Sequence, residues 1–82
     1  MKIREEFLWG YAERLEEDAA TALAYAMEEL GNSKNPEIHV YVADALMALE
    51  DYEGAIEEIN EALEKNIINV NYAKSLKGEA LF

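Results

Sequence analysis

Hydrophobic residues recur every three or four positions along residues 38–49 and again along residues 55–63, and a short polar break separates the two stretches. This spacing is that of one face of an α-helix. The apolar faces consist of Ile38, Val42, Ala45, Leu46 and Leu49 in the first stretch and of Ala55, Ile56, Ile59, Ala62 and Leu63 in the second. Each stripe needs a partner surface, so the two helices should pack antiparallel across the break.

Residues at the ends of both stretches favour helix starts. Asn35 is a good N-cap, Pro36 suits the first helical position because it has no N–H to leave unpaired, and Glu37 favours the positive end of the helix. The second helix should begin near residue 52 or 53, capped by Asp51. Local sequence therefore predicts where both helices start.

The rest of the chain shows the same helical spacing, which predicts helices over about 2–16 and 18–30 and another from residue 69 or 71 onward. Only an acidic run marks the break between the first two. Gly31 is the expected C-terminal cap of the second helix. Met27, on the apolar face of that helix, is expected in the core, with exposure on a binding groove as the alternative. No segment alternates apolar and polar residues as a strand does, so we expect an all-α protein of about five helices.

Residues 35–68 resemble one tetratricopeptide repeat. That family places a small residue midway along its first helix and a signature of small and apolar residues along its second. In this sequence those positions are Ala43, Asp51, Tyr52, Ala55, Ile56, Ile59, Ala62 and Leu63. His39 stands where the family often has Trp, and Glu50 where a turn glycine is usual. The resemblance implies antiparallel helix–turn–helix repeats wound into a right-handed superhelix.

Weaker copies flank this repeat at spacings close to the family period of about 34 residues. Residues 19–26 repeat the spacing of residues 55–62, and residues 78–81 repeat that of residues 43–46. We therefore expect a single domain made of a degenerate repeat over 1–34, the best repeat over 35–68, and the first helix of a following repeat or a capping helix over 69–82.

Charge and composition narrow the range of partners. Seven Lys and Arg stand against 18 Asp and Glu, which gives a net charge of −11. Phosphate backbones would be repelled, so we expect no nucleic acid among the partners. There is no cysteine, the N-terminal residues lack the apolar core of a signal peptide, and no apolar run is long enough to span a membrane. A cytoplasmic protein that binds no membrane is the default expectation.

Catalysis is not expected. The many glutamates lie opposite the apolar stripes rather than in a dry pocket that would displace their pKa values. His39 is the sole histidine and is expected to be structural or exposed. No glycine-rich phosphate loop occurs, and no Glu-x-x-His pair is present to build a dimetal site. We therefore predict no enzyme activity and no cofactor, and a small metal-binding bundle is the weakest alternative.

The predicted function is that of a protein-interaction module, an adaptor or co-chaperone-like scaffold. The helix over 38–49 has more apolar residues than one core face requires, and in tetratricopeptide proteins the second face of such a helix lines a groove that holds a peptide. The residues predicted to line this groove are Glu37, Val40, Tyr41, Asp44, Met47 and Ala48. Because two of them are acidic, a basic or amphipathic segment should fit, and an acidic C-terminal tail should not. The alternative is that the first helix or a second copy covers this face.

Self-association is the second functional hypothesis. The sequence stops at an apolar end in the middle of what resembles a repeat's first helix, whereas repeat arrays end in polar caps. We expect either that the chain is a fragment of a longer array or that Leu81 and Phe82 pack against a second copy in a homodimer.

Overall fold

The fold is that of a computed structural model, which describes residues 3–65 and 70–81. Over these residues the chain forms helices and no strand. The helices are α1 (Glu5–Glu17), α2 (Ala19–Ser33), α3 (Ile38–Ala48), α4 (Tyr52–Glu64) and α5 (Val70–Leu81). The prediction of an all-α protein with about five helices is confirmed.

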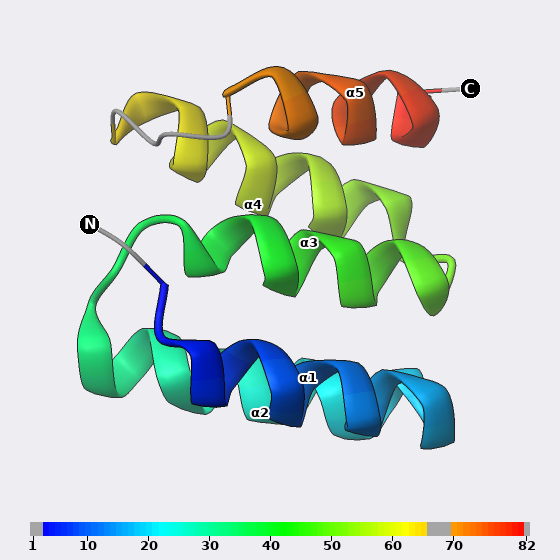
Figure 1. The fold of residues 1–82 in the computed structure, drawn as a ribbon. Coiled ribbons are helices and arrows are strands. Elements are labelled where there is room, and N and C mark those ends of the chain that lie inside the picture. Colours follow the sequence, from blue (N-terminus) through cyan, green and yellow to red (C-terminus); the bar gives the residue numbers. More distant parts are fainter. Residues whose placement is uncertain (1–2, 66–69, 82) are drawn as a thin grey trace.

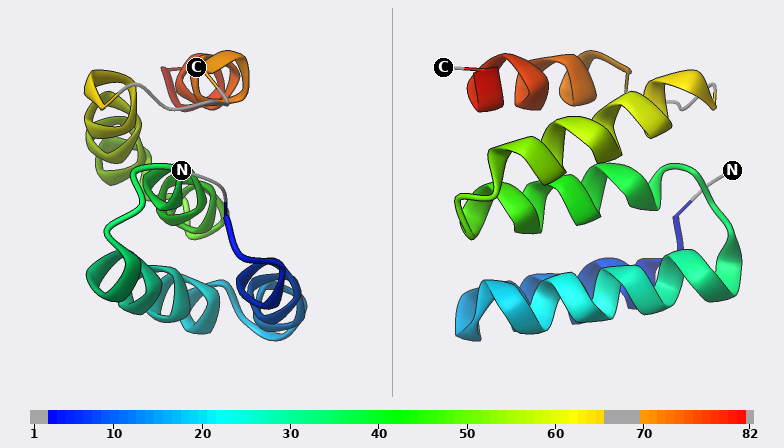
Figure 2. Two further views of the ribbon diagram at one scale, coloured as in Figure 1. Left: turned by 60° about the vertical axis from the view of Figure 1, so that its left-hand side comes forward. Right: turned by 180° about the vertical axis from the view of Figure 1, so that it is seen from behind.

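The helices run alternately in opposite directions and form two layers. Helices α1, α3 and α5 lie in one layer, and α2 and α4 lie behind them (Figures 1 and 2). Each helix packs mainly against its neighbours in the sequence, and α3 also contacts α5. This arrangement is consistent with stacked helix pairs, while the right-handed superhelix stays a prediction.

Two aspartates cap helix starts, and of these two caps the sequence predicted only the one at Asp51. Asp18 has an extended backbone, with φ −167° and ψ 123°, and its side chain accepts a hydrogen bond of 3.2 Å from the amide of Ala20. Asp51 accepts one of 3.1 Å from the amide of Gly54 at the start of α4. Just before it, Glu50 takes the left-handed conformation at φ 63°, which costs a non-glycine residue about 1–2 kcal/mol. That is the position where the tetratricopeptide pattern has its turn glycine.

The boundary between α2 and α3 differs from the prediction. Helix α2 continues past Gly31 to Ser33, and Lys34 is the C-cap, in the left-handed conformation at φ 56°. The extra turn is stabilised by the hydroxyl of Ser33, which donates to the carbonyl of Glu29 at 2.9 Å. Asn35 caps a tight turn in front of α3, because its side chain accepts from the amide of Glu37 at 3.0 Å and α3 itself begins only at residue 38.

Helix α3 is shared by two hydrophobic clusters, one on each side of it. Residues of α1, α2 and α3 form the first cluster, which contains Phe7, Tyr11, Ala22, Ala26, Ile38, Val42 and Ala45. Residues of α3, α4 and α5 form the second, which contains Val40, Ala43, Ala55, Ile59, Ala62, Ala73 and Leu76. A helix with apolar residues on two sides needs a packing partner on each of them, and α3 has one core on each side.

Two core predictions are wrong. Met27 is 57 % exposed rather than buried, and Leu49, predicted on the packed stripe of α3, is also exposed. Met27 lies on α2 beside the groove described below, where no helix covers it. Leu49 follows the last residue of α3 and lies in the turn to α4.

Gly10 allows α1 to approach α2 closely. A Cβ at this position would overlap the hydroxyl of Tyr25 and lie 2.7 Å from its Cζ. The ring of Tyr25 is held in place, since Phe7 stacks on it with centroids 5.4 Å apart and the Arg14 guanidinium lies 4.0 Å from its centroid. Only glycine fits here without moving the ring.

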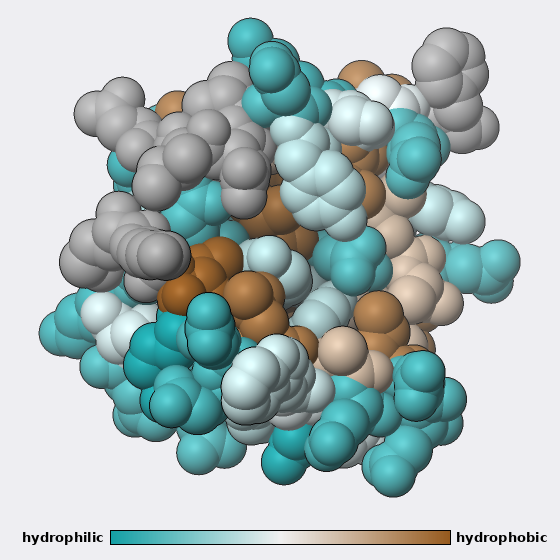
Figure 3. All heavy atoms as spheres, viewed as in Figure 1, coloured by the Kyte–Doolittle hydropathy of each residue, from teal (hydrophilic) through white to brown (hydrophobic). Residues whose placement is uncertain are grey.

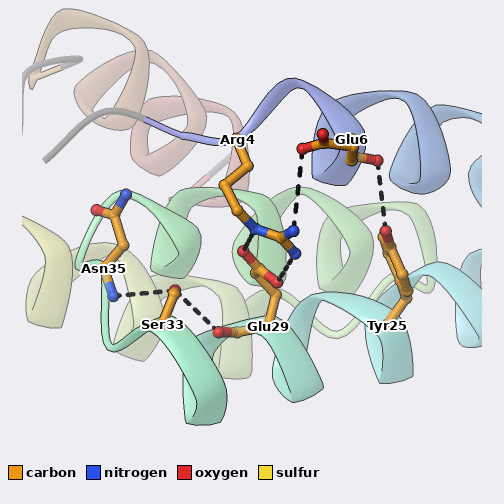
Figure 4. A network of polar contacts seen from close by, with 6 residues as sticks. All are labelled: Arg4, Glu6, Tyr25, Glu29, Ser33 and Asn35. Atoms are coloured by element: carbon orange, nitrogen blue, oxygen red, sulfur yellow. Dashed lines mark hydrogen bonds and ion pairs between the residues drawn. The ribbon is translucent and has the colours of Figure 1, made fainter.

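An ion pair ties the start of α1 to the end of α2. Arg4 donates from Nε to one carboxylate oxygen of Glu29 at 2.9 Å and from Nη2 to the other at 2.6 Å. The side chain of Glu29 is almost fully buried, and Figure 4 shows how the network continues through Ser33 to the backbone of Asn35. The hydrogen bonds from Arg4 hold the pKa of Glu29 below its usual range, although burial acts in the opposite direction.

We predict that Arg4→Ala destabilises the protein because it leaves a buried carboxylate without its cation. The folded-state pKa of Glu29 lies below the ordinary value of 4.5, so its contribution to the free energy of unfolding is present above pH 4.5 and is lost as the pH falls further. Urea unfolding of both proteins at neutral and acid pH measures this difference. The control is Glu6→Gln, which removes the other carboxylate near Arg4. That carboxylate is exposed and lies 3.9 Å from Nη1 of Arg4, so its loss should cost little stability. An equal effect of the two substitutions would contradict the prediction.

The small residue of the predicted repeat gives a second prediction. Ala43 is fully buried in the second cluster, so Ala43→Leu should overpack the contact of α3 with α4 and α5 and cost about 1–3 kcal/mol. Ala48→Leu adds the same side chain to the exposed end of α3 and should change stability little. Thermal unfolding by circular dichroism compares the two, and a larger loss for Ala48→Leu would mean that this packing is wrong.

Candidate functional site

The face that the sequence predicts as a binding surface lies on the layer of α1, α3 and α5. Helix α3 is recessed between the other two when the molecule is seen nearly end-on (Figure 2, left). Figure 3 shows hydrophobic residues exposed in the middle of this face and hydrophilic residues around them. We call this face the recess; its centre is mixed and its rim is polar.

The structure removes two of the six predicted groove residues from this surface. Val40 and Glu37 are each only 2 % exposed, so neither is available to a peptide. Val40 belongs to the cluster that α3 forms with α4 and α5, which means that the second apolar face of α3 serves the core. Tyr41, Asp44 and Met47 are partly buried and Ala48 is exposed, so these four keep some surface open to solvent.

Asp44 is the polar centre of this face, and three helices meet at it. The hydroxyl of Tyr11 on α1 donates to Oδ2 of Asp44 at 2.7 Å, and it also lies 3.2 Å from the backbone carbonyl of Tyr41. The hydroxyl of Tyr72 on α5 lies 3.4 Å from Oδ1, which makes a longer and weaker hydrogen bond. Tyr72 is 48 % exposed, so one side of the cluster remains open to solvent.

Aromatic packing fixes the tyrosines around this carboxylate. The rings of Tyr11 and Tyr41 meet edge to face with centroids 5.3 Å apart, and Phe7 packs edge-on against Tyr41 at 5.5 Å. Phe7 also stacks on Tyr11 at 5.8 Å. Such pairs contribute about 0.5–1.5 kcal/mol beyond their buried area, so the ring positions are well defined.

The electrostatics of the cluster favour neutral tyrosines beside a charged Asp44. Burial is the main cause that raises the pKa of Tyr11, Tyr41 and Tyr72, and the charge of Asp44 adds to each of the three shifts. No ion pair within residues 3–65 and 70–81 includes Asp44. The hydroxyls thus orient the carboxylate without neutralising it.

Sequence reasoning missed two members of this cluster. The sequence analysis assigned no binding role to Tyr11 or to Tyr72. A signal was nevertheless present, because each first helix of the three expected repeats carries one tyrosine, at positions 11, 41 and 72. Periodicity alone does not show that their hydroxyls converge on one carboxylate.

The two residues predicted for self-association have different outcomes. Leu81 is 66 % exposed at the end of α5. Phe82 lies outside the described residues. An exposed leucine is compatible with a contact between copies, so this hypothesis stays a prediction.

Comparisons with known proteins give no family for the chain: no protein-family model, curated protein or solved structure shows a significant match. The resemblance to tetratricopeptide repeats therefore rests on the residues alone. Within the described part of the chain, no helix is long and apolar enough to cross a membrane. The same residues contain no group of three or more His, Cys, Asp or Glu placed to hold a metal ion.

We predict that the tyrosines around Asp44 resist ionisation. Because their folded-state pKa values lie above the ordinary value of 10.0, their contribution to stability is present below pH 10 and is lost as the pH rises above it. The ring carbon shifts in NMR spectra recorded against pH measure each tyrosine separately. Asp44→Asn removes the negative charge and should lower the pKa of Tyr72, and an unchanged Tyr72 titration would contradict the assigned contact.

Proposed function

We propose that the chain is a protein-interaction module whose recessed face on α1, α3 and α5 binds a lysine or arginine side chain of a partner protein. The observation that carries this proposal is the state of Asp44. Its carboxylate lies in the recess, is oriented by hydroxyls from two other helices, and takes part in no ion pair among the described residues.

The chemistry around Asp44 suits an ammonium or guanidinium group. A carboxylate that is already oriented loses little conformational freedom when a cation binds, so more of the interaction energy appears as affinity. The half-exposed ring of Tyr72 adds an aromatic face beside the charge, and cations are attracted to such faces by about 0.5–2 kcal/mol. The overall charge of −11 also attracts a basic partner and disfavours an acidic one.

The apolar neighbours of Asp44 suit an amphipathic partner segment. Met47 packs partly against the second cluster and Ala48 is exposed one residue further along α3. Methionine adapts to different apolar surfaces, which favours contact with a side chain that flanks the bound cation. The partner that fits best thus has Lys or Arg next to an apolar residue.

The test titrates the protein with a short peptide that has one lysine between two leucines, followed by NMR and calorimetry. We expect shifted amide signals at Tyr41, Asp44 and Tyr72 on binding. A hydrogen bond to a charged group contributes about 1.5–3 kcal/mol, so Asp44→Asn should weaken binding about tenfold or more. Asp44→Lys reverses the charge and should abolish binding.

The matched control is Glu28→Gln, which removes one negative charge from an exposed site on α2. This variant should bind the peptide as the unmodified protein does, and a peptide with glutamate in place of lysine should not bind. Equal weakening by Glu28→Gln and Asp44→Asn would show that only net charge matters and would sink the proposal. Circular dichroism of each variant checks that the helices are intact.

A further inference from the structure

A hollow lies between α2 and α4, on the side of the molecule opposite the recess. These two helices are in front when the molecule is seen from behind, with α3 between them (Figure 2, right). The hollow has a volume of about 380 Å³, and its apolar walls include Leu23, Met27 and Leu30 of α2 and Leu46 of α3. It is therefore a groove with an apolar floor, separate from the recess around Asp44.

The volume of this groove matches large apolar side chains of a partner. A cavity of roughly 150 Å³ lined by apolar residues accommodates a benzene ring. By that measure the groove between α2 and α4 has room for about two such side chains. Met27, more than half exposed at its edge, offers a flexible apolar surface that adapts to them.

The wall on α4 is acidic. Glu57 and Glu58 line the groove, and a second hollow of about 320 Å³ continues from them along α4 past Glu61 and Glu64. His39 lies 3.0 Å from Glu58, and Lys65 lies 3.6 Å from Glu61. Neither Glu57 nor Glu64 belongs to an ion pair in the described part of the chain. Among residues 3–65 and 70–81, no Lys or Arg lines either hollow.

We propose that this groove is a second docking site, which takes a basic amphipathic helix of a partner protein. Two bulky apolar side chains one turn apart on that helix would enter the groove, and Lys or Arg beside them would pair with the glutamates along α4. This is how an amphipathic helix binds a hydrophobic groove. Charge complementarity disfavours a second copy of the chain as the occupant, since each copy carries a net charge of −11.

This inference differs from the function proposed above in the face that binds and in the residues that form the site. The recess on α1, α3 and α5 presents one oriented carboxylate among tyrosines, whereas the groove presents an apolar floor beside a row of glutamates. The two sites can thus be tested separately. A chain with both sites would hold two basic partner segments, one on each side of the same small domain.

The probe is a synthetic helical peptide of about 15 residues, or about four turns, with leucines on one face and lysines on the other. We expect it to shift the amide signals of Leu23, Met27, Leu30 and Leu46 in NMR spectra. Met27→Arg should weaken its binding about tenfold or more, because the arginine fills the groove and can pair with Glu57 or Glu58. Ala24→Arg is the matched control, since Ala24 is exposed on α2 and does not line the groove.

Two further comparisons make the test specific. A peptide with glutamate in place of lysine, or serine in place of leucine, should not bind, and Asp44→Asn should leave binding of the leucine–lysine peptide at the groove unchanged. Equal binding by Met27→Arg and Ala24→Arg would overturn the proposal. The proposal would also be overturned if the peptide did not bind and the chain formed a dimer that Met27→Arg abolishes. In that case a second copy of the chain would occupy the groove. Thermal unfolding of both variants shows whether each is folded.

Discussion

The structure depends on α3, an 11-residue helix that is buried on two sides at once. One side packs against α1 and α2, and the other against α4 and α5. A helix in this position cannot keep a polar stripe along its length, which explains why so many of its residues are apolar. Small residues on α3 and α4 allow the close approach, with Ala43, Ala45, Ala55 and Ala62 all fully buried.

This double burial decides which residues are exposed on the face of α1, α3 and α5. Val40, which the sequence placed in a peptide groove, is needed to join α3 to α4 and α5. The same packing brings α1 and α5 to either side of α3, so that Tyr11 and Tyr72 reach Asp44 from opposite sides of it. The face therefore has a hydrogen-bonded carboxylate at Asp44, while Val40 and Glu37, which the sequence predicted to line a groove here, are buried.

The layer of α2 and α4 has the opposite character. These helices contact α3 but leave a groove between them, which is lined by leucines of α2 and α3 and has the exposed Met27 at its edge. The acidic outer face of α4, which reads in the sequence as a solvated surface, forms one wall of this groove. Solubility alone explains exposed glutamates, but the apolar floor beside them makes a docking role worth testing.

Local sequence by itself determined the helices and most of their boundaries, because capping and periodicity act within a few residues. The net charge follows from the composition alone. Asp18 ends α1 and caps the start of α2, and Asp51 caps the start of α4, each through hydrogen bonds to residues at most four positions away. The tertiary structure alone decided which faces stay open, since periodicity groups residues on a face but does not name the helix that covers it. For this reason Val40 proved buried, Met27 exposed, and Tyr11 and Tyr72 became neighbours of Asp44 through contacts between residues far apart in the chain.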